Sequence, residues 1–333
     1  NGPLILLDEG AEIDELPPAA LTERVAFHVD LSDVAMAAAM PTLKHGQPQS
    51  VTHAPEQLAQ IVAIAAQCGI DSLRAPLFAL RAARAHAAFS SRSFVTDEDI
   101  QITADVVYGH KFGLATTFDV FTPAANSNGA AVLFMVSGGW YSNWSPPEQL
   151  QHRMKPLTDK GFTVFAVRHG SSPKFSIAEA VADVRRSVRF IRLNADRFKI
   201  DPKRIGVFGM SAGGHLSLML GTASDEGNPN AKDPVLKVSD RVQAVVAYVA
   251  PTDLRVAAKD APDRLPAYER FPALDIDQQT AEPDSPLLHV TSDDAPTLLL
   301  AGTKDELVPV FHSRNIRKAF EEANVTSELV EFP

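Results

Sequence analysis

Residues 204–215 read RIGVFGMSAGGH, and this stretch decides the fold that we predict for most of the chain. Gly209, Ser211 and Gly213 satisfy the pattern Gly-x-Ser-x-Gly, which requires a very sharp turn from a strand into a helix and leaves the serine hydroxyl exposed at its tip. Glycine is needed two positions before and two positions after the serine, because side chains there would collide across the turn. The stretch therefore predicts an exposed serine on a tight strand-to-helix turn.

The flanking residues supply the strand and the helix that this turn requires. The run Ile205–Phe208 has the pattern of a short buried strand, and Leu216–Leu220 continues as an apolar helix. Loops of small residues that contain a serine are common, so the five-residue pattern by itself is weak evidence. In this context it predicts that Ser211 is a nucleophile.

Acyl transfer through a serine also needs hydrogen-bond donors for the negatively charged oxygen of the intermediate. The apolar run Val132–Val136 is followed by Gly138 and Gly139, whose backbone N–H groups can approach such an oxygen closely. A glycine pair after a strand could equally form a plain turn, but its place upstream of the nucleophile favours an oxyanion hole. The third expected donor is the N–H of Ala212, the residue after the nucleophile.

The carboxylate that would orient a catalytic base is predicted at Asp305. Residues 296–309 read PTLLLAGTKDELVP and place Asp305 in a loop directly after a buried strand. An aspartate in a loop is usually a turn former or a helix cap. Asp305 nevertheless follows Ser211 in the chain and lies at the carboxyl edge of the predicted sheet, which is the order and the place of the acid in hydrolases with this kind of turn.

The general base is expected beyond the printed sequence. In this arrangement the base is a histidine that follows the acid, in the loop after the final strand. We assign that strand to Ser327–Phe332, and the sequence stops at Pro333. We therefore expect the 333-residue chain to be truncated just before its catalytic histidine.

Four histidines within the chain are poorer candidates for the base. His215 lies one helical turn beyond Ser211, so its side chain should point away from the attack site and pack under the sheet. His312 is expected at the surface of the helix that precedes the last strand. His289 and His169 precede the acid in the chain, although His169 follows a strand and is the best of these alternatives.

From residue 102 onward the chain alternates between apolar strands and helices. Residues 102–108 and 114–121 alternate like an antiparallel strand pair, and the later strands are apolar on both faces. Such strands, when they alternate with helices, predict a mostly parallel, doubly wound α/β sheet. The later strands are expected at 130–136, 162–167, 205–208, 242–249, 296–300 and 327–332, and the helices at 147–160, 177–198, 212–220 and 310–323. Segments 223–239 and 254–290 are expected as insertions over the carboxyl edge of the sheet, where substrate pockets form.

Composition and charge restrict the classes of partner. With 45% hydrophobic and 22% charged residues the chain reads as an ordinary globular protein, and its net charge of -10 without a basic block argues against nucleic acid. No apolar run reaches the length of a membrane span. Cys68 is the only cysteine, so neither a disulfide framework nor a thiolate metal site is expected within one chain, and we expect a cytoplasmic protein.

Residues 1–100 differ from the rest of the chain in composition and in the spacing of their apolar residues. They begin without an initiator methionine, from which we expect a segment upstream, and residues 55–90 are rich in alanine, leucine and arginine at helical spacing. This composition and spacing change near Ile100, and no flexible linker marks the change. We predict two domains, residues 1–100 and 101–333, and a chimeric or misassembled reading frame is one explanation for the junction.

The first domain resembles the C-terminal AAA+ part of the magnesium chelatase D subunit. The matching stretches are LILLDE at 4–9, PAALTERVAF at 18–27, and the run from SLRA at 72–75 through RAARA at 81–85 to VTDEDI at 95–100. The resemblance implies a degenerate Walker B strand at Asp8 and Glu9 and a sensor arginine at Arg74 on a helical lid. The sequence lacks the phosphate-binding Gly-x-x-x-x-Gly-Lys-Ser/Thr loop, so we do not expect this segment to hydrolyse nucleotides. A helical module with solvated arginines is the alternative.

Residues 102–333 resemble the esterase and lipase branch of the α/β-hydrolases, close to the feruloyl-esterase-like and hormone-sensitive-lipase-like groups. The matching motifs are FDVFTP at 118–123, SGGW at 137–140, DPKRI at 201–205, GMSAGGH at 209–215, PTDL at 251–254 and GTKDELVP at 302–309. The resemblance implies the roles inferred above for the nucleophile, the acid and the three oxyanion donors. Ser137 departs from the family, because many relatives carry a histidine there, and the departure bears on how the oxyanion donors are positioned.

The sequence therefore predicts a serine carboxylic-ester hydrolase that forms an acyl-enzyme on Ser211, acts on a small-molecule ester and needs no metal or organic cofactor. Two alternatives stay open. One is a chelatase-type interaction subunit that carries an inactive hydrolase. The other is a serine peptidase of the same fold, since none of the motifs distinguishes an ester from an amide. We expect little turnover from a chain that lacks its base.

Overall fold

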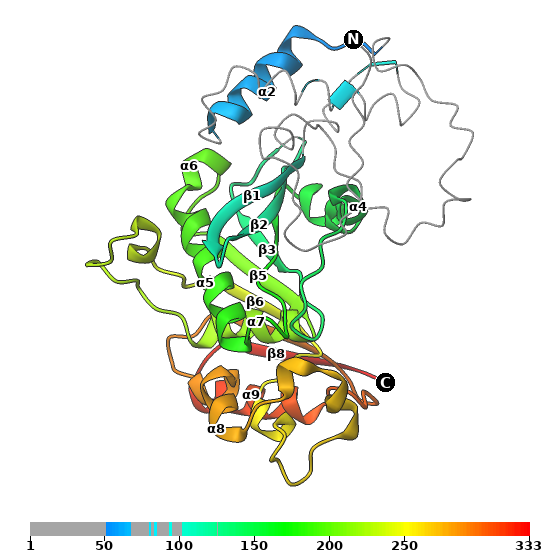
Figure 1. Cartoon of the computed structure of the whole chain (residues 1–333), viewed down its shortest axis with the longest axis vertical. Helices are drawn as coiled ribbons and strands as arrows, with labels where there is room; N and C mark the ends of the chain where they lie inside the picture. The colour runs from blue at the N-terminus through cyan, green and yellow to red at the C-terminus, as the bar shows by residue number, and fades with distance from the viewer. Residues whose placement is uncertain (1–50, 68–79, 81–82, 85–92, 95–101, 125) are drawn as a thin grey trace. The chain divides into compact units, whose positions relative to one another are not determined.

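The computed structural model describes residues 51–67, 80, 83–84, 93–94, 102–124 and 126–333 (Figure 1). The chain divides into two compact units, Asn1–Ile100 and Gln101–Pro333. The residues that carry the chelatase resemblance, including Asp8, Glu9 and Arg74, and also Cys68, lie outside the described residues.

The described part of the first unit is built around the helix α2, Pro55–Gln67. Proline at its first position and Glu56 in its first turn are favourable residues for a helix N-terminus. Ile61 packs in a small buried cluster with Val51, Leu80 and Ala83. This helix lies where the alanine- and leucine-rich spacing predicts one.

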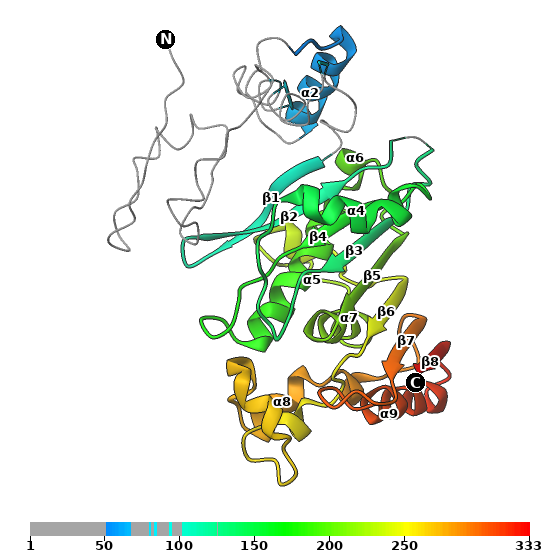
Figure 2. The same ribbon diagram turned by 90° about the vertical axis from the view of Figure 1, so that its right-hand side faces the viewer.

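The second unit contains one eight-stranded sheet with the order β1-β2-β4-β3-β5-β6-β7-β8 (Figures 1 and 2). Strands β1 and β2 pair antiparallel, and β2 also pairs antiparallel with β4, whereas every later neighbour in the sheet is parallel. The predicted doubly wound, mostly parallel α/β fold is therefore confirmed. The strands are β1 (Ile102–Lys111), β2 (Leu114–Phe121), β3 (Ala131–Met135), β4 (Thr163–Val167), β5 (Ile205–Met210), β6 (Ala244–Tyr248), β7 (Thr297–Gly302) and β8 (Ser327–Phe332).

Helices cover both faces of this sheet. Successive side chains of a strand point to opposite faces, so Val164 and Phe165 of β4 belong to different layers. Val164 packs with Leu150 and Met154 of α4, while Phe165 lies in the larger core to which α5, α7 and α9 contribute. The helices are α4 (Pro147–Thr158), α5 (Ile177–Leu193), α6 (Ala195–Phe198), α7 (Ala212–Thr222), α8 (Gln278–Ala281) and α9 (Phe311–Glu322).

One predicted helix is divided in the structure. The sequence pattern predicts a single helix over 177–198, but α5 ends at Leu193 and the short α6 follows. The Asn194 side chain donates a hydrogen bond to the Phe190 carbonyl, and its backbone leaves the helical region at φ -107° and ψ 26°. An asparagine that satisfies a helix carbonyl with its own side chain favours the end of a helix.

Both predicted insertions contain short 3-10 helices. The first carries η3 (Pro234–Lys237), and the second carries η4 (Leu254–Ala257), η5 (Pro266–Arg270), η6 (Pro272–Leu274), α8, η7 (Glu282–Asp284) and η8 (Pro286–His289). Four of these six 3-10 helices begin with proline beyond an extended residue, and proline favours a helix start because its φ is already near the helical value. No described helix is both long and apolar enough to cross a membrane.

Candidate active site

Ser211 stands at the turn between β5 and α7, which we call the elbow. Its backbone has φ 54° and ψ -121°, a conformation that residues with a side chain rarely adopt. The Ser211 N–H donates to the Tyr248 carbonyl at 2.9 Å, and the His215 N–H donates to the Ser211 carbonyl at 2.9 Å. Strain of this kind is held by the surrounding hydrogen bonds and is concentrated at functional sites.

The glycines of the elbow are required by its packing. A Cβ atom on Gly209 would lie 2.3 Å from the carbonyl of Gly213, and one on Gly213 would lie 2.6 Å from the Met135 carbonyl oxygen. Real Cβ contacts are essentially never below 3.0 Å. The structure thus shows the steric reason for the Gly-x-Ser-x-Gly spacing.

Residues 137–142, the oxyanion loop, follow β3 and lie beside the elbow. Gly139 has φ 57°, and a Cβ atom on it would lie 2.6 Å from the Phe271 ring. The N–H of Gly138, the other glycine predicted as a donor, donates to the Tyr141 carbonyl at 2.9 Å. Within the described residues, no hydrogen bond engages the N–H of Gly139 or Ala212. Of the three predicted oxyanion donors, Gly139 and Ala212 are therefore the two whose N–H groups have no partner within the described residues.

The oxyanion loop is attached to the segment that follows β4. His169 Nδ1 lies 2.8 Å from the Gly170 carbonyl oxygen, which can only accept, so Nδ1 carries the proton. His169 Nε2 therefore accepts from the Ser137 hydroxyl at 2.8 Å. Burial lowers the pKa of His169, which favours this neutral form. A further bond runs from the Ser172 N–H to the Trp140 carbonyl.

Asp305 lies in the turn between β7 and α9 and is half-buried. Its Oδ1 accepts from the N–H groups of Leu307 at 2.9 Å and Val308 at 2.8 Å. Two such bonds are typical of an aspartate that forms a turn. They occupy only one of the two carboxylate oxygens. In the described part of the chain, no hydrogen bond to Oδ2 occurs, so that oxygen is able to accept from a catalytic base.

A narrow apolar cleft brings these three elements together. It is lined by Ser211, by residues of the oxyanion loop, by the turn after Asp305 and by the second insertion: Gly139, Trp140, Ser211, Pro251, Leu254, Ala257, Tyr268, Phe271, Leu274, Leu307 and Val308. Burial raises the pKa of Tyr268 to about 12, with a smaller contribution from the charge of Asp305. The sequence reasoning missed Tyr268 and Phe271, because no local pattern shows which insertion residues reach the serine.

His215 and His289 hydrogen-bond to groups away from Ser211. His215 accepts from Trp140 Nε1 at 3.2 Å and donates through Nε2 to the Asp284 carbonyl at 2.6 Å, as expected for a histidine that packs away from the attack site. Burial lowers the pKa of His215 to about 4. His289 Nε2 donates to a carbonyl in its own segment.

The prediction for His312 is wrong. This residue is 1% exposed rather than at the surface, because its face of α9 packs on the chain after β6, where its Nδ1 accepts from the Thr252 N–H. Burial lowers the pKa of His312 to about 4. Among the described residues, none of the histidines hydrogen-bonds the Ser211 hydroxyl, and no group of three or more His, Cys, Asp or Glu residues could hold a metal ion.

Comparisons with known proteins match different families to the two parts of the chain. The BD-FAE family model matches residues 118–320, and the AAA lid domain model matches residues 58–124. The chain is 29% identical over 216 residues to the probable carboxylic ester hydrolase LipM of Mycobacterium tuberculosis, which covers 63% of this chain and 49% of LipM. It is 43% identical over 116 residues to the magnesium-chelatase 60 kDa subunit of Cereibacter sphaeroides, which covers 32% of this chain and 21% of that subunit. The chain thus spans about half the length of its esterase relative.

Solved structures show the same fold. A truncated carbohydrate esterase from gut microbiota superimposes with a TM-score of 0.59 at 23% identity, over 70% of this chain and 87% of that chain. Esterase 2 of Thermogutta terrifontis superimposes with a TM-score of 0.55 at 23% identity, over 68% of this chain and 81% of that chain. The sheet order and the elbow described above are therefore those of the α/β-hydrolase fold.

Proposed function

The chain belongs to the BD-FAE family, and from this premise we propose that it is a carboxylic-ester hydrolase that works through an acyl-enzyme on Ser211. The observation that carries the proposal is the strained elbow, which presents Ser211 to the same cleft as Gly139 of the oxyanion loop. The names of similar proteins, such as LipM and the esterase LipQ of Mycobacterium tuberculosis, support an ester as the substrate.

In the proposed reaction the Ser211 oxygen attacks the ester carbonyl carbon and gives its proton to the general base. The carbonyl oxygen becomes negatively charged and accepts hydrogen bonds from the N–H groups of Gly139 and Ala212. The alcohol then leaves with the proton from the base, and the acyl group stays on Ser211. Water adds to this ester, the base takes its proton, and the acid is released as the serine hydroxyl re-forms.

We propose that Asp305 orients a histidine that follows β8. The end of β8 supports this placement, because Phe332 pairs with Gly302 and the Thr303 N–H donates to the Phe332 carbonyl at 2.8 Å. A chain that continues from Phe332 therefore starts next to the turn that carries Asp305. A histidine in a short loop there would be within reach of the free carboxylate oxygen.

The apolar cleft favours a small, uncharged acyl group. Its walls near Ser211 are the side chains of Leu254, Leu274 and Phe271, which offer no partner for a charge. Burial of an unpaired charge among such side chains is costly. We therefore propose short-chain esters as substrates.

The experiment uses the chain extended beyond Pro333 through the loop after β8, because the base is proposed there. It compares hydrolysis of p-nitrophenyl acetate by this extended chain and by its Ser211→Ala variant, with Ser127→Ala as an exposed serine control. A fluorophosphonate probe, read by intact mass, tests the acyl-enzyme directly. We expect one adduct on the extended chain and on the control, and none on Ser211→Ala. Equal hydrolysis and equal labelling in all three proteins would contradict the proposal and favour a chelatase-type interaction subunit. A panel of peptide substrates distinguishes an esterase from a serine peptidase.

A further inference from the structure

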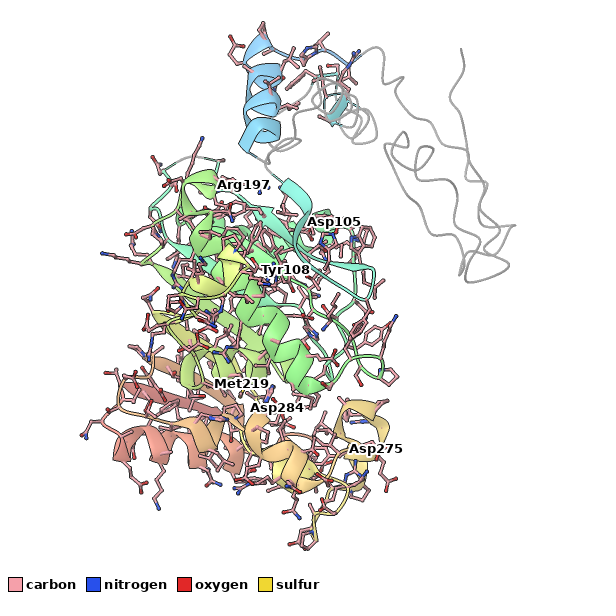
Figure 3. All side chains as sticks on the ribbon, turned by 60° about the vertical axis from the view of Figure 1, so that its left-hand side comes forward. Asp105, Tyr108, Arg197, Met219, Asp275 and Asp284 are labelled. Carbon is pink, nitrogen blue, oxygen red and sulfur yellow. The ribbon has the colours of Figure 1, made fainter. Side chains whose placement is uncertain are left out.

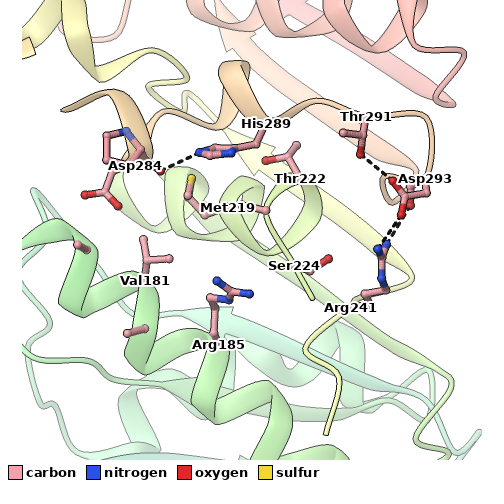
Figure 4. Close-up of a pocket in the computed structure, with 14 residues that line it drawn as sticks. Val181, Arg185, Met219, Thr222, Ser224, Arg241, Asp284, His289, Thr291 and Asp293 are labelled. Atoms are coloured by element: carbon pink, nitrogen blue, oxygen red, sulfur yellow. Dashed lines mark hydrogen bonds and ion pairs between the residues drawn. The ribbon is translucent and has the colours of Figure 1, made fainter. Parts of the chain in front are cut away.

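A second cavity lies away from the Ser211 cleft, between α5, the end of α7 and the segment 283–293. It is open to solvent on one side and has a volume of about 590 Å³, which is within the range of small-molecule sites. Figure 3 shows Met219 and Asp284 close together at this place, and Figure 4 shows the lining in detail. The lining residues are Ala178, Val181, Ala182, Arg185, Met219, Thr222, Ala223, Ser224, Arg241, Pro283, Asp284, His289, Thr291 and Asp293.

Asp284 is the unusual member of this lining. The residue is 7% exposed, and its carboxylate points into the cavity on the side of Val181 (Figure 4). Its carbonyl accepts from His215, which fixes the backbone here. Within the described part of the chain, no hydrogen bond or ion pair reaches the Asp284 carboxylate.

The two arginines of the lining are already paired with other carboxylates. Arg185 contacts Asp225 and Asp240 at 2.5 Å each. Arg241 contacts Asp293 at 2.6 Å, at the far end of the cavity (Figure 4). Neither arginine therefore compensates the charge of Asp284.

An ionised carboxylate in this position is costly without a partner. Burial raises the pKa of Asp284 to about 6, and nearby His289 opposes the shift. At pH 8 the carboxyl group is still ionised in most molecules. A bound cation would supply the missing charge, and the adjacent side chains of Val181 and Met219 would cover an alkyl chain.

We propose that the Asp284 cavity is a binding site for a primary alkylammonium ion. The ammonium group donates to the Asp284 carboxylate, and the alkyl chain packs on Val181 and Met219. The unpaired carboxylate of Asp284 distinguishes this site from the Ser211 cleft, whose lining includes no charged side chain. Binding here does not depend on the proposed ester hydrolysis.

The test is isothermal titration calorimetry at pH 8 with n-butylammonium chloride, and with n-butanol as the neutral analogue at the same ionic strength. We expect saturable binding of n-butylammonium to the native chain and at least tenfold weaker binding of n-butanol. Asp284→Asn, which keeps the shape and removes the charge, should weaken n-butylammonium binding at least tenfold. Asp263→Asn removes an exposed charge outside the lining of the cavity and should change the affinity less than threefold.

Several outcomes would overturn the proposal. These are the absence of saturable n-butylammonium binding, equal affinity for n-butanol, or equal losses in the two aspartate variants. The comparison of the two ligands on the native chain decides the question even if Asp284→Asn fails to fold. Ser211→Ala should bind n-butylammonium as the native chain does, so failure of the esterase proposal leaves this test intact.

Discussion

The Ser137 hydroxyl donates a hydrogen bond to Nε2 of His169 over 2.8 Å, and this contact joins the first residue of the oxyanion loop to the end of β4. The imidazole of this pair comes from the second residue after β4, and the serine supplies the proton of the hydrogen bond. The pair holds the backbone immediately before Gly139, whose N–H is a proposed oxyanion donor.

Ser137→Ala should therefore lower kcat about tenfold and leave KM nearly unchanged, because a displaced oxyanion donor weakens transition-state binding more than substrate binding. Steady-state kinetics with p-nitrophenyl acetate, on the chain extended through the loop after β8, measure both constants. His169→Gln should have the same effect, whereas His152→Gln, an exposed histidine on α4, should have none. A rise in KM at constant kcat would show that Ser137 contacts substrate rather than positions the loop.

The elbow glycines should tolerate no side chain. Gly209→Ala places a Cβ atom 2.3 Å from the Gly213 carbonyl group, so the turn must move, and we expect a loss of about 2–3 kcal/mol in the free energy of unfolding. Gly206→Ala on the same strand is the matched control, since its Cβ atom would meet the nearest atom at 3.6 Å. Urea denaturation measures both. Equal losses in the two variants would contradict the steric account.

Features carried by local patterns could be predicted from the sequence. The elbow, the parallel strands and the turn of Asp305 each depend on a few adjacent residues, and the structure places all of them as the pattern indicates. The walls of the cleft could not be predicted, because Tyr268 and Phe271 reach Ser211 only through the path of an insertion without regular periodicity. The burial of His312 depends on packing against Thr252, sixty residues away in the chain.

Acid should destabilise the second unit through its buried histidines. The pKa of His215 and that of His312 are about 4 in the folded chain, below the ordinary value of 6.5, because both rings are buried. From pH 6.5 down to 4 the unfolded chain binds protons that the folded chain does not. The free energy of unfolding should fall over this window by up to about 3 kcal/mol for each histidine.

Urea denaturation of the native chain between pH 7 and pH 4 measures this loss. His215→Gln cannot take up the proton, so its unfolding free energy should depend less steeply on pH. His152→Gln, which changes an exposed histidine, should keep the native slope. A native slope in His215→Gln would show that this histidine is protonated equally in both states.

Asp284 should lower the free energy of unfolding as the pH rises, which is opposite to the effect of the two histidines. Its pKa is raised from 3.8 to about 6 by burial, so the folded chain is favoured while the carboxyl group is protonated and loses this advantage as the pH rises from 3.8 through 6. Asp284→Asn should therefore be more stable than the native chain at pH 8, by roughly 1–2 kcal/mol, and nearly equal at pH 4. Thermal denaturation at the two pH values measures the difference. A variant less stable than the native chain at pH 8 would show that the ionised carboxylate has a partner.

The general base can be located by extending the chain beyond Pro333. Because Phe332 lies beside the turn of Asp305, we expect a histidine within roughly ten residues of the end of β8, since most loops between elements are no longer than this. If a histidine in that loop is the base, as we propose, the extended protein should hydrolyse p-nitrophenyl acetate at least a hundredfold faster than the 333-residue chain, since removal of one triad member typically costs several orders of magnitude.

Alanine variants of the added histidine and of His169 show which of the two is the general base. Replacement of the added histidine by alanine should return the extended protein to the low rate of the shorter chain, because Ser211 then has no group to accept its proton. His169→Ala should lower the rate far less, since its ring accepts from Ser137 and acts only on the position of the oxyanion loop. If the 333-residue chain already reaches the full rate and His169→Ala abolishes it, then His169 is the base, and the hydrogen bond from Ser137 must break during catalysis.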